Sequence, residues 1–200
     1  HDRAGTTILA ERLRVKPSSV SGMIKKLADS YSDLVDYKRH RGVKLTPKGR
    51  SYALRLIRKH RLIETFLCTV LDVNWSDVHK EAEILEHHLS DTLEDRIDHF
   101  LNHPQTDPHG EPIPSPTGEI EEDTTLSLLD IRDGEKAVIR KVKAQEADIL
   151  EYLDSLGLTL GTAITIQEKA PFDGPLTLTV HSEPEERQIS IGRSIGGTIF

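Results

Sequence analysis

Prolines cluster in one short stretch that divides this chain into two parts with different patterns of apolar residues. Five of the ten prolines lie between residues 104 and 116. Because proline lacks a backbone N–H, so dense a group stops a helix and marks a boundary or tether. Before the stretch, apolar residues recur at helical spacing; after it, they fall into short runs separated by glycine and proline. The sequence therefore predicts a helical part and a smaller β-rich part.

The first part begins with the pattern of a winged helix-turn-helix. We expect a helix over residues 6–13, capped by Thr6 or Thr7, and a second helix over residues 18–27 after the turn at Pro17. Residues 34–46 read as two short strands around a basic turn, which is the wing. The residues expected to form the buried stripe of the second helix are Val20, Met23, Ile24 and Leu27.

The charge distribution assigns DNA binding to the same end. Residues 1–61 carry 16 basic and 5 acidic side chains, whereas residues 62–200 carry 10 basic and 28 acidic ones. A surplus of positive charge at one end is typical of a nucleic-acid-binding domain. Candidates for contact with base edges are Ser18, Ser19, Ser21 and Gly22, and candidates for phosphate contact are Lys16, Lys25, Lys26, Arg39 and Arg41.

Histidines and carboxylates gather on the two helices expected over residues 47–71 and 76–103. His60 and Glu64 are four residues apart, and such spacing puts both on one helical face. The second set shares a face in the same way and comprises His79, Glu83, Glu86 and His87. Six nitrogen and oxygen donors without a cysteine suit Mn²⁺ or Fe²⁺ better than Zn²⁺.

Other chemistries find less support. A di-iron carboxylate enzyme needs Glu-x-x-His on two helices, and a zinc protease needs His-Glu-x-x-His; neither pattern occurs. A phosphate loop and a Gly-x-Ser-x-Gly elbow are also missing, so we expect no catalytic residues and no enzyme. The alternative is a winged-helix regulator that responds to a small molecule, or to an oxidant through Cys68, and holds a structural metal.

Short strands over residues 136–142, 163–166, 176–180 and 188–191, with a helix near residues 149–153, predict a small β-barrel. The fold class is thus mainly α with small β. We expect a DNA-binding domain over residues 1–56, a helical metal-binding and dimerisation domain with its proline-rich tether over 57–122, and the barrel over 123–200. A single cysteine favours the cytoplasm, and no apolar run predicts a membrane span.

This order of motifs resembles the diphtheria-toxin-repressor family of metal-dependent transcriptional repressors. The motifs that carry the resemblance are Lys16–Val20, Leu45–Gly49, Arg58–Glu64 and Val78–Ser90. In that family the position of Glu83 is cysteine in iron-type members and glutamate in manganese-type members, so the chain resembles the manganese-type branch. The barrel resembles the family's SH3-like domain. The resemblance also implies a helix before residue 1 that supplies a further ligand.

The resemblance further implies two metal sites per subunit, a homodimer and a palindromic DNA operator. Metal excess would repress uptake genes. Glu83, Glu86 and His87 match the site that couples to DNA binding, and His60, Glu64 and His79 match its neighbour. Asp107 and His109 align with a segment that adds ligands to the second site in longer members. Glu146 and Asp148 of the barrel rank below them.

Overall fold

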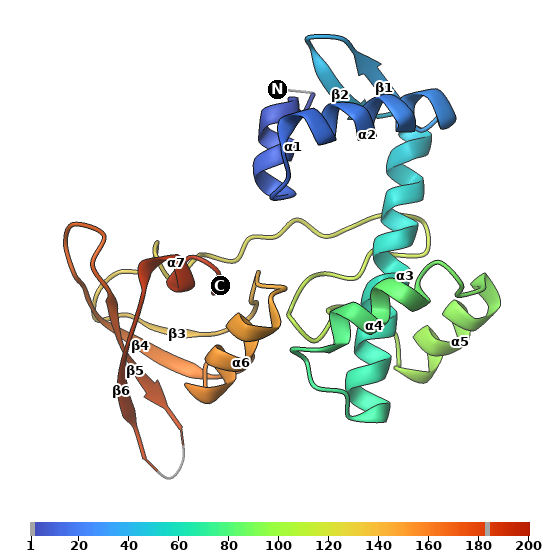
Figure 1. Ribbon diagram of the computed structural model, residues 1–200. Coiled ribbons are helices and arrows are strands. Elements are labelled where there is room, and N and C mark those ends of the chain that lie inside the picture. The colour runs from blue at the N-terminus through green and yellow to red at the C-terminus, as the bar shows by residue number, and fades with distance from the viewer. Residues whose placement is uncertain (1–2, 183–184) are drawn as a thin grey trace. The chain divides into compact units, whose positions relative to one another are not determined.

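The computed structural model describes residues 3–182 and 185–200, and these fall into two compact units (Figure 1). The first unit comprises the chain up to Leu56 and a separate short segment, Pro116–Gly118. The second unit comprises Ile57–Ser115 and Glu119–Phe200. Helix α3 (Pro47–Leu71) begins in the first unit and ends in the second, as the periodicity over residues 47–71 predicts.

The first unit has the predicted order of two helices and a hairpin. Helices α1 (Thr6–Arg12) and α2 (Pro17–Ser30) precede strands β1 (Val35–Lys38) and β2 (Gly42–Leu45), which pair antiparallel. Its small core is built on Ala10, Val20 and Ile24. The mainly-α fold class with a helix-turn-helix and wing is thereby confirmed for this end.

Two local expectations for this unit are wrong. The N-cap of α1 is Gly5 and makes no side-chain cap, so neither Thr6 nor Thr7 caps the helix. Met23 and Leu27 are 59% and 43% exposed, so the buried stripe of α2 reduces to Val20 and Ile24. The reason is size: the apolar core described for this unit is small, and it includes Val20 and Ile24 but not Met23 or Leu27.

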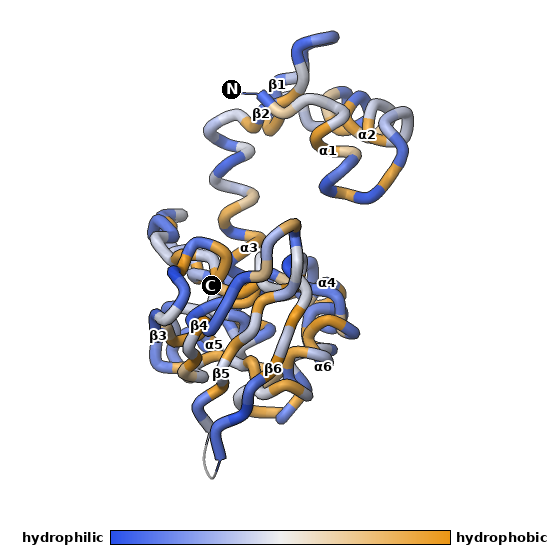
Figure 2. The backbone as a smooth tube through the Cα atoms, turned by 90° about the vertical axis from the view of Figure 1, so that its left-hand side faces the viewer, coloured by the Kyte–Doolittle hydropathy of each residue, from blue (hydrophilic) through white to orange (hydrophobic). Residues whose placement is uncertain are grey.

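In the second unit α3 packs against two shorter helices, α4 (Val78–Leu85) and α5 (Asp91–Phe100). In Figure 2 hydrophobic and hydrophilic stretches alternate along α3, as expected of a helix with one buried face. The single helix expected over residues 76–103 is wrong. The chain leaves α4 after Leu85, and the Ser90 hydroxyl accepts from the Leu93 N–H to start a new helix.

The C-terminal part forms a four-stranded antiparallel sheet in the order β3-β4-β5-β6. Side chains of β5 alternate between buried and half-buried, and the buried ones join α6 in an apolar core. The strand expected over residues 136–142 ends at Val138, and Val142 instead makes an isolated bridge to Ile199. The elements of this part are β3 (Lys136–Val138), α6 (Ala147–Ser155), β4 (Ala163–Lys169), β5 (Leu176–His181), β6 (Arg187–Ile191) and α7 (Arg193–Gly196).

Within residues 3–182 and 185–200, no helix has the length and apolar character needed to cross a membrane.

Candidate metal centre

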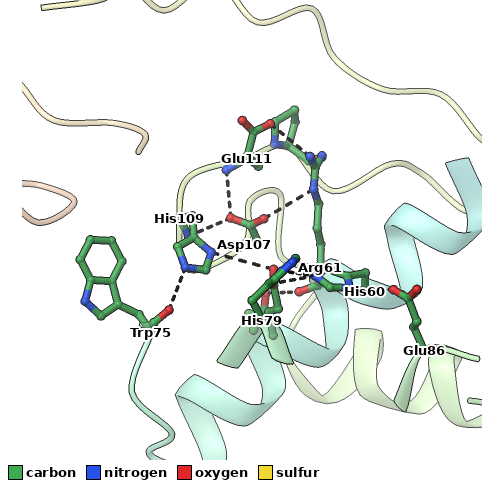
Figure 3. Close-up of polar contacts among 11 residues, drawn as sticks. His60, Arg61, Trp75, His79, Glu86, Asp107, His109 and Glu111 are labelled. Carbon is green, nitrogen blue, oxygen red and sulfur yellow. Dashed lines mark hydrogen bonds and ion pairs between the residues drawn. The ribbon is translucent and has the colours of Figure 1, made fainter. Parts of the chain in front are cut away.

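Donor atoms from α3 and α4 converge on one point beside the axis of α3 (Figure 3). His60 Nε2 lies 2.9 Å from both Glu64 Oε1 and His79 Nδ1, and the last two atoms are 3.1 Å apart. An octahedral ion with bonds of about 2.2 Å holds neighbouring donors about 3.1 Å apart. The three atoms therefore already have the spacing that one six-coordinate ion requires.

The hydrogen bond at the far side of the His60 ring fixes which nitrogen faces this point. His60 Nδ1 donates to Glu86 Oε2 at 2.6 Å. Because a carboxylate only accepts, Nδ1 carries a proton toward Glu86, and Nε2 is the ring nitrogen that faces Glu64 and His79 and would lose its proton to bind a metal ion there. Glu86, directly after α4, thus orients a donor on α3.

The electrostatics of the cluster favour charged groups. Burial alone would raise the pKa of Glu64, but hydrogen bonds from His60 and His79 outweigh it and lower the pKa to about 2. Burial alone would lower the pKa of His60, yet its bonds to Glu64 and Glu86 raise it above the ordinary value. Glu64 is therefore a permanent carboxylate that attracts positive charge.

A second group of donors meets the first at Glu64. Asp107 and His109 lie in the segment after α5, and both are buried, as Glu64 is. His109 Nδ1 is 3.9 Å from Glu64 Oε2. Burial, together with the negative charge of Glu64, raises the pKa of Asp107. A divalent cation fits a donor set in which the permanent charge of Glu64 and burial disfavour the charge of a neighbouring carboxylate.

His109 is held by a residue that the sequence analysis missed. Its Nε2 donates to the carbonyl of Trp75 at 2.9 Å, and its ring stacks on the indole at 5.6 Å between centroids. The bond to a carbonyl fixes the proton on Nε2. The lone pair of Nδ1 then faces Glu64, where it can bind a metal ion. No motif marks Trp75, since its role depends on a segment 34 residues away.

Arg61 is a second residue that the sequence analysis missed. Its guanidinium lies 3.1 Å from Glu111 Oε2 and 3.5 Å from Asp107 Oδ2, and it donates to the carbonyl of Pro112 (Figure 3). Arg61 thus fastens the Asp107 segment to α3, next to the candidate ligand His60.

The structure gathers six of the eight candidate ligands and leaves two at the surface. Glu83 on α4 is exposed. The side chain of His87 is 60% exposed, and its Nε2 lies 3.4 Å from Glu86 Oε1. Among the described residues, neither group of converging donors includes Glu146 or Asp148. The gathered residues are His60, Glu64, His79, Glu86, Asp107 and His109.

The candidate DNA contacts all lie at the surface of the first unit. Arg39 and Arg41 belong to the turn of the β1–β2 hairpin, and the others come from α2 or the residue before it. The Ser21 hydroxyl donates to the Pro17 carbonyl at 3.0 Å, which leaves its oxygen as an acceptor. Their contacts with DNA stay a prediction.

Three family models match consecutive segments of the chain. The N-terminal DNA-binding domain of iron-dependent repressors matches residues 1–43. Their metal-binding and dimerisation domain matches residues 46–115, and the FeoA domain matches residues 126–200. We use the name FeoA domain for residues 126–200 from here on.

Two relatives and one solved structure agree with these segments. The diphtheria toxin repressor of Corynebacterium glutamicum is 32% identical over 79% of this chain and 73% of its own length. The regulator MntR of Geobacillus kaustophilus is 42% identical over 50% of this chain and 68% of its own. A solved manganese-dependent transcriptional repressor in complex with manganese has a TM-score of 0.86 at 37% identity, covering 100% of this chain and 90% of that one.

The domains and the converging donors define the class: a metal-dependent DNA-binding repressor of transcription. Within that class the chain belongs to the diphtheria toxin repressor family.

Proposed function

We propose that this protein represses metal-uptake genes in the cytoplasm when Mn²⁺, or Fe²⁺ in its place, is abundant. Each subunit holds two ions, and a homodimer binds a palindromic operator. One observation carries the choice of metal. Every donor that the structure gathers is an imidazole nitrogen or a carboxylate oxygen, and such a set suits Mn²⁺ and Fe²⁺.

We assign Glu83, Glu86 and His87 to the site that couples to DNA binding, and His60, Glu64, His79, Asp107 and His109 to its neighbour. A bound ion supplies positive charge that offsets the buried carboxylates. Glu86 connects the two sets, because its carboxylate already accepts from His60. A change at either set is thereby transmitted to the other through one hydrogen bond.

Exposed apolar side chains on the helical part support the homodimer. Ile84 and Phe100 are 64% and 67% exposed, and Leu85 and Leu93 are 43% and 49% exposed. Exposed apolar side chains on α4 and α5 suit a self-complementary interface. A dimer then offers two copies of α2 to successive half-sites of a palindrome.

The rival function, an oxidant-sensing regulator, is disfavoured by the state of Cys68. Burial, with the negative charges of Glu64 and Asp107, raises the pKa of this thiol to about 11. Because the thiolate is the reactive form, Cys68 is a poor redox sensor at neutral pH.

The experiment is retention of genomic DNA fragments by the protein with Mn²⁺, with Fe²⁺ under anoxia, and with chelator. Retention that requires metal supports the proposal and gives the preferred ion and the operators. Equal retention in all three conditions contradicts it, because the metal cluster would then be structural.

Glu64→Gln is the sharpest variant for the same assay. It keeps the side-chain shape but removes the charge shared by both groups of donors. We expect metal-stimulated retention to fall by at least about tenfold, since a neutral amide is a poor ligand for a divalent ion. Glu81→Gln, an exposed position on α4, is the matched control and should behave as the unchanged protein.

A further inference from the structure

The segment Asp107–Glu111, which we call the metal loop, is a rigid turn. Asp107 Oδ1 accepts from the backbone N–H groups of His109 and Glu111 at 2.8 and 3.0 Å. The Asp107 N–H donates to the Glu111 carbonyl, and the Gly110 N–H donates to the Asp107 carbonyl. These bonds fix Asp107 and His109 relative to each other. They do not by themselves place the pair beside Glu64.

The FeoA domain holds the other side of this loop. The Val142 N–H donates to the His109 carbonyl at 2.8 Å. Gly110 lies so close to the segment before Val142 that an added Cβ would be 2.1 Å from the Arg140 carbonyl oxygen and 2.8 Å from Lys141 Cα. Both contacts are to backbone, so no rotamer change would relieve them. Only glycine lets the loop sit against the FeoA domain.

On its opposite side the loop is bound to the helical part. Arg61 of α3 contacts Asp107 and Glu111, and the Trp75 carbonyl accepts from His109. The metal loop is thus clamped between α3 and residues 140–142 of the FeoA domain. Release of either side would let Asp107 and His109 move away from Glu64.

We propose that Gly110 and the backbone of residues 140–142 position the second metal site, and that seating of the FeoA domain and metal binding there reinforce each other. This inference rests on the proposed function, because it assumes that Asp107 and His109 are ligands. The FeoA domain acts through its backbone, as a positioning element. Coupling is reciprocal by linkage, so an ion held by Asp107 and His109 also stabilises the contact between the FeoA domain and the metal loop.

The test compares Gly110→Ala with Gly134→Ala. Both glycines have positive φ, +84° and +83°, so both alanines carry the same backbone strain. A Cβ at Gly134 meets nothing within 4 Å, so only Gly110→Ala lifts the loop from the FeoA domain. We expect titration calorimetry with Mn²⁺ to show about tenfold to hundredfold weaker binding at one of two sites in Gly110→Ala. Gly134→Ala should bind like the unchanged protein. Equal binding by all three proteins would overturn the proposal.

Hydrogen exchange of the Val142 amide supplies a second readout, and its Mn²⁺ arm uses the unchanged protein. In the metal-free protein this amide should exchange faster in Gly110→Ala than in Gly134→Ala. In the unchanged protein, Mn²⁺ should slow its exchange. Exchange that Mn²⁺ leaves unaltered would overturn the coupling even if Gly110→Ala failed to fold.

The two proposals fail in distinguishable ways. If the proposed function is wrong, DNA retention will not depend on metal in any variant. If only this inference is wrong, DNA retention will depend on metal, but Gly110→Ala will change neither the exchange rate of the Val142 amide nor the Mn²⁺ affinity of the second site.

Discussion

Some residues of the metal centre supply ligand atoms, and others orient those ligands through hydrogen bonds. The His60 ring has one nitrogen bonded to Glu86 and the other aimed at Glu64 and His79, and His109 is directed in the same way by Trp75. A histidine that ligates a metal commonly donates its other N–H to such a partner. The directing bonds exist in both groups of donors, which is why we interpret them as a centre prepared for an ion.

Glu83 offers a test of metal preference at the same scale. It is exposed on α4, two positions before Leu85, where a replacement costs little stability. Because thiolate is a softer ligand than carboxylate, Glu83→Cys should shift the metal that best stimulates DNA retention from Mn²⁺ toward softer ions such as Cd²⁺ or Zn²⁺. The measurement is retention across a series of metals, with Glu81→Cys as the control. An unchanged order of metals would show that Glu83 does not set the preference.

Between elements, a buried arginine joins α3 to α5 and to the proline-rich stretch. Arg58 Nε lies 3.0 Å from Glu94 Oε1, its Nη2 lies 3.1 Å from Asp98 Oδ1, and its Nη1 donates to the Pro114 carbonyl at 2.8 Å. The side chain is 5% exposed. Burial raises the pKa of Glu94 despite this partner, so the carboxylate depends on Arg58 for compensation.

Removing Arg58 should therefore destabilise the helical part strongly. Arg58→Met removes the buried guanidinium and leaves Glu94 with Lys59 at 3.9 Å and Asp98 with His103 at 2.7 Å. Breaking such a buried pair costs about 3–5 kcal/mol in the free energy of unfolding. Chemical denaturation measures the change. Adding Glu94→Gln should recover part of the loss, because one buried negative charge is removed, and the exposed Lys80→Met should change stability by less than about 0.5 kcal/mol. A loss of that small size for Arg58→Met would show that the pair contributes little.

The elements that the sequence predicts best are those with local signals. Helix α3 has the predicted bounds because Pro47 and the apolar spacing both lie within it. The break between α4 and α5 was not predicted, because the apolar pattern continues across Ser90. The capping role of Ser90 depends on the local path of the chain. His60 and Glu64 follow from helical spacing, whereas Arg61, Trp75 and Gly110 act on segments distant in sequence. No local pattern announces such contacts.

For the whole molecule, the division of charge sets how DNA binding responds to salt. The basic surplus lies within residues 1–61, and the remainder is acidic. Phosphates are attracted to the first and repelled by the second. Binding should therefore weaken steeply as salt rises, since each phosphate contact releases condensed counterions.

Lys25 provides the corresponding test, because it is exposed on α2 among the proposed DNA contacts. Each phosphate contact contributes about 1 to the slope of log affinity against log salt. The proposed dimer loses two such contacts in Lys25→Gln, so the slope should become shallower by about 2, and affinity should fall equally for specific and non-specific DNA. Fluorescence anisotropy at several salt concentrations, with saturating Mn²⁺, measures both. Lys136→Gln, exposed on β3 in the acidic part, is the control and should leave the slope unchanged. Equal slopes for the two variants would exclude Lys25 from the phosphate contacts, and a loss restricted to specific DNA would make it a base-reading residue instead.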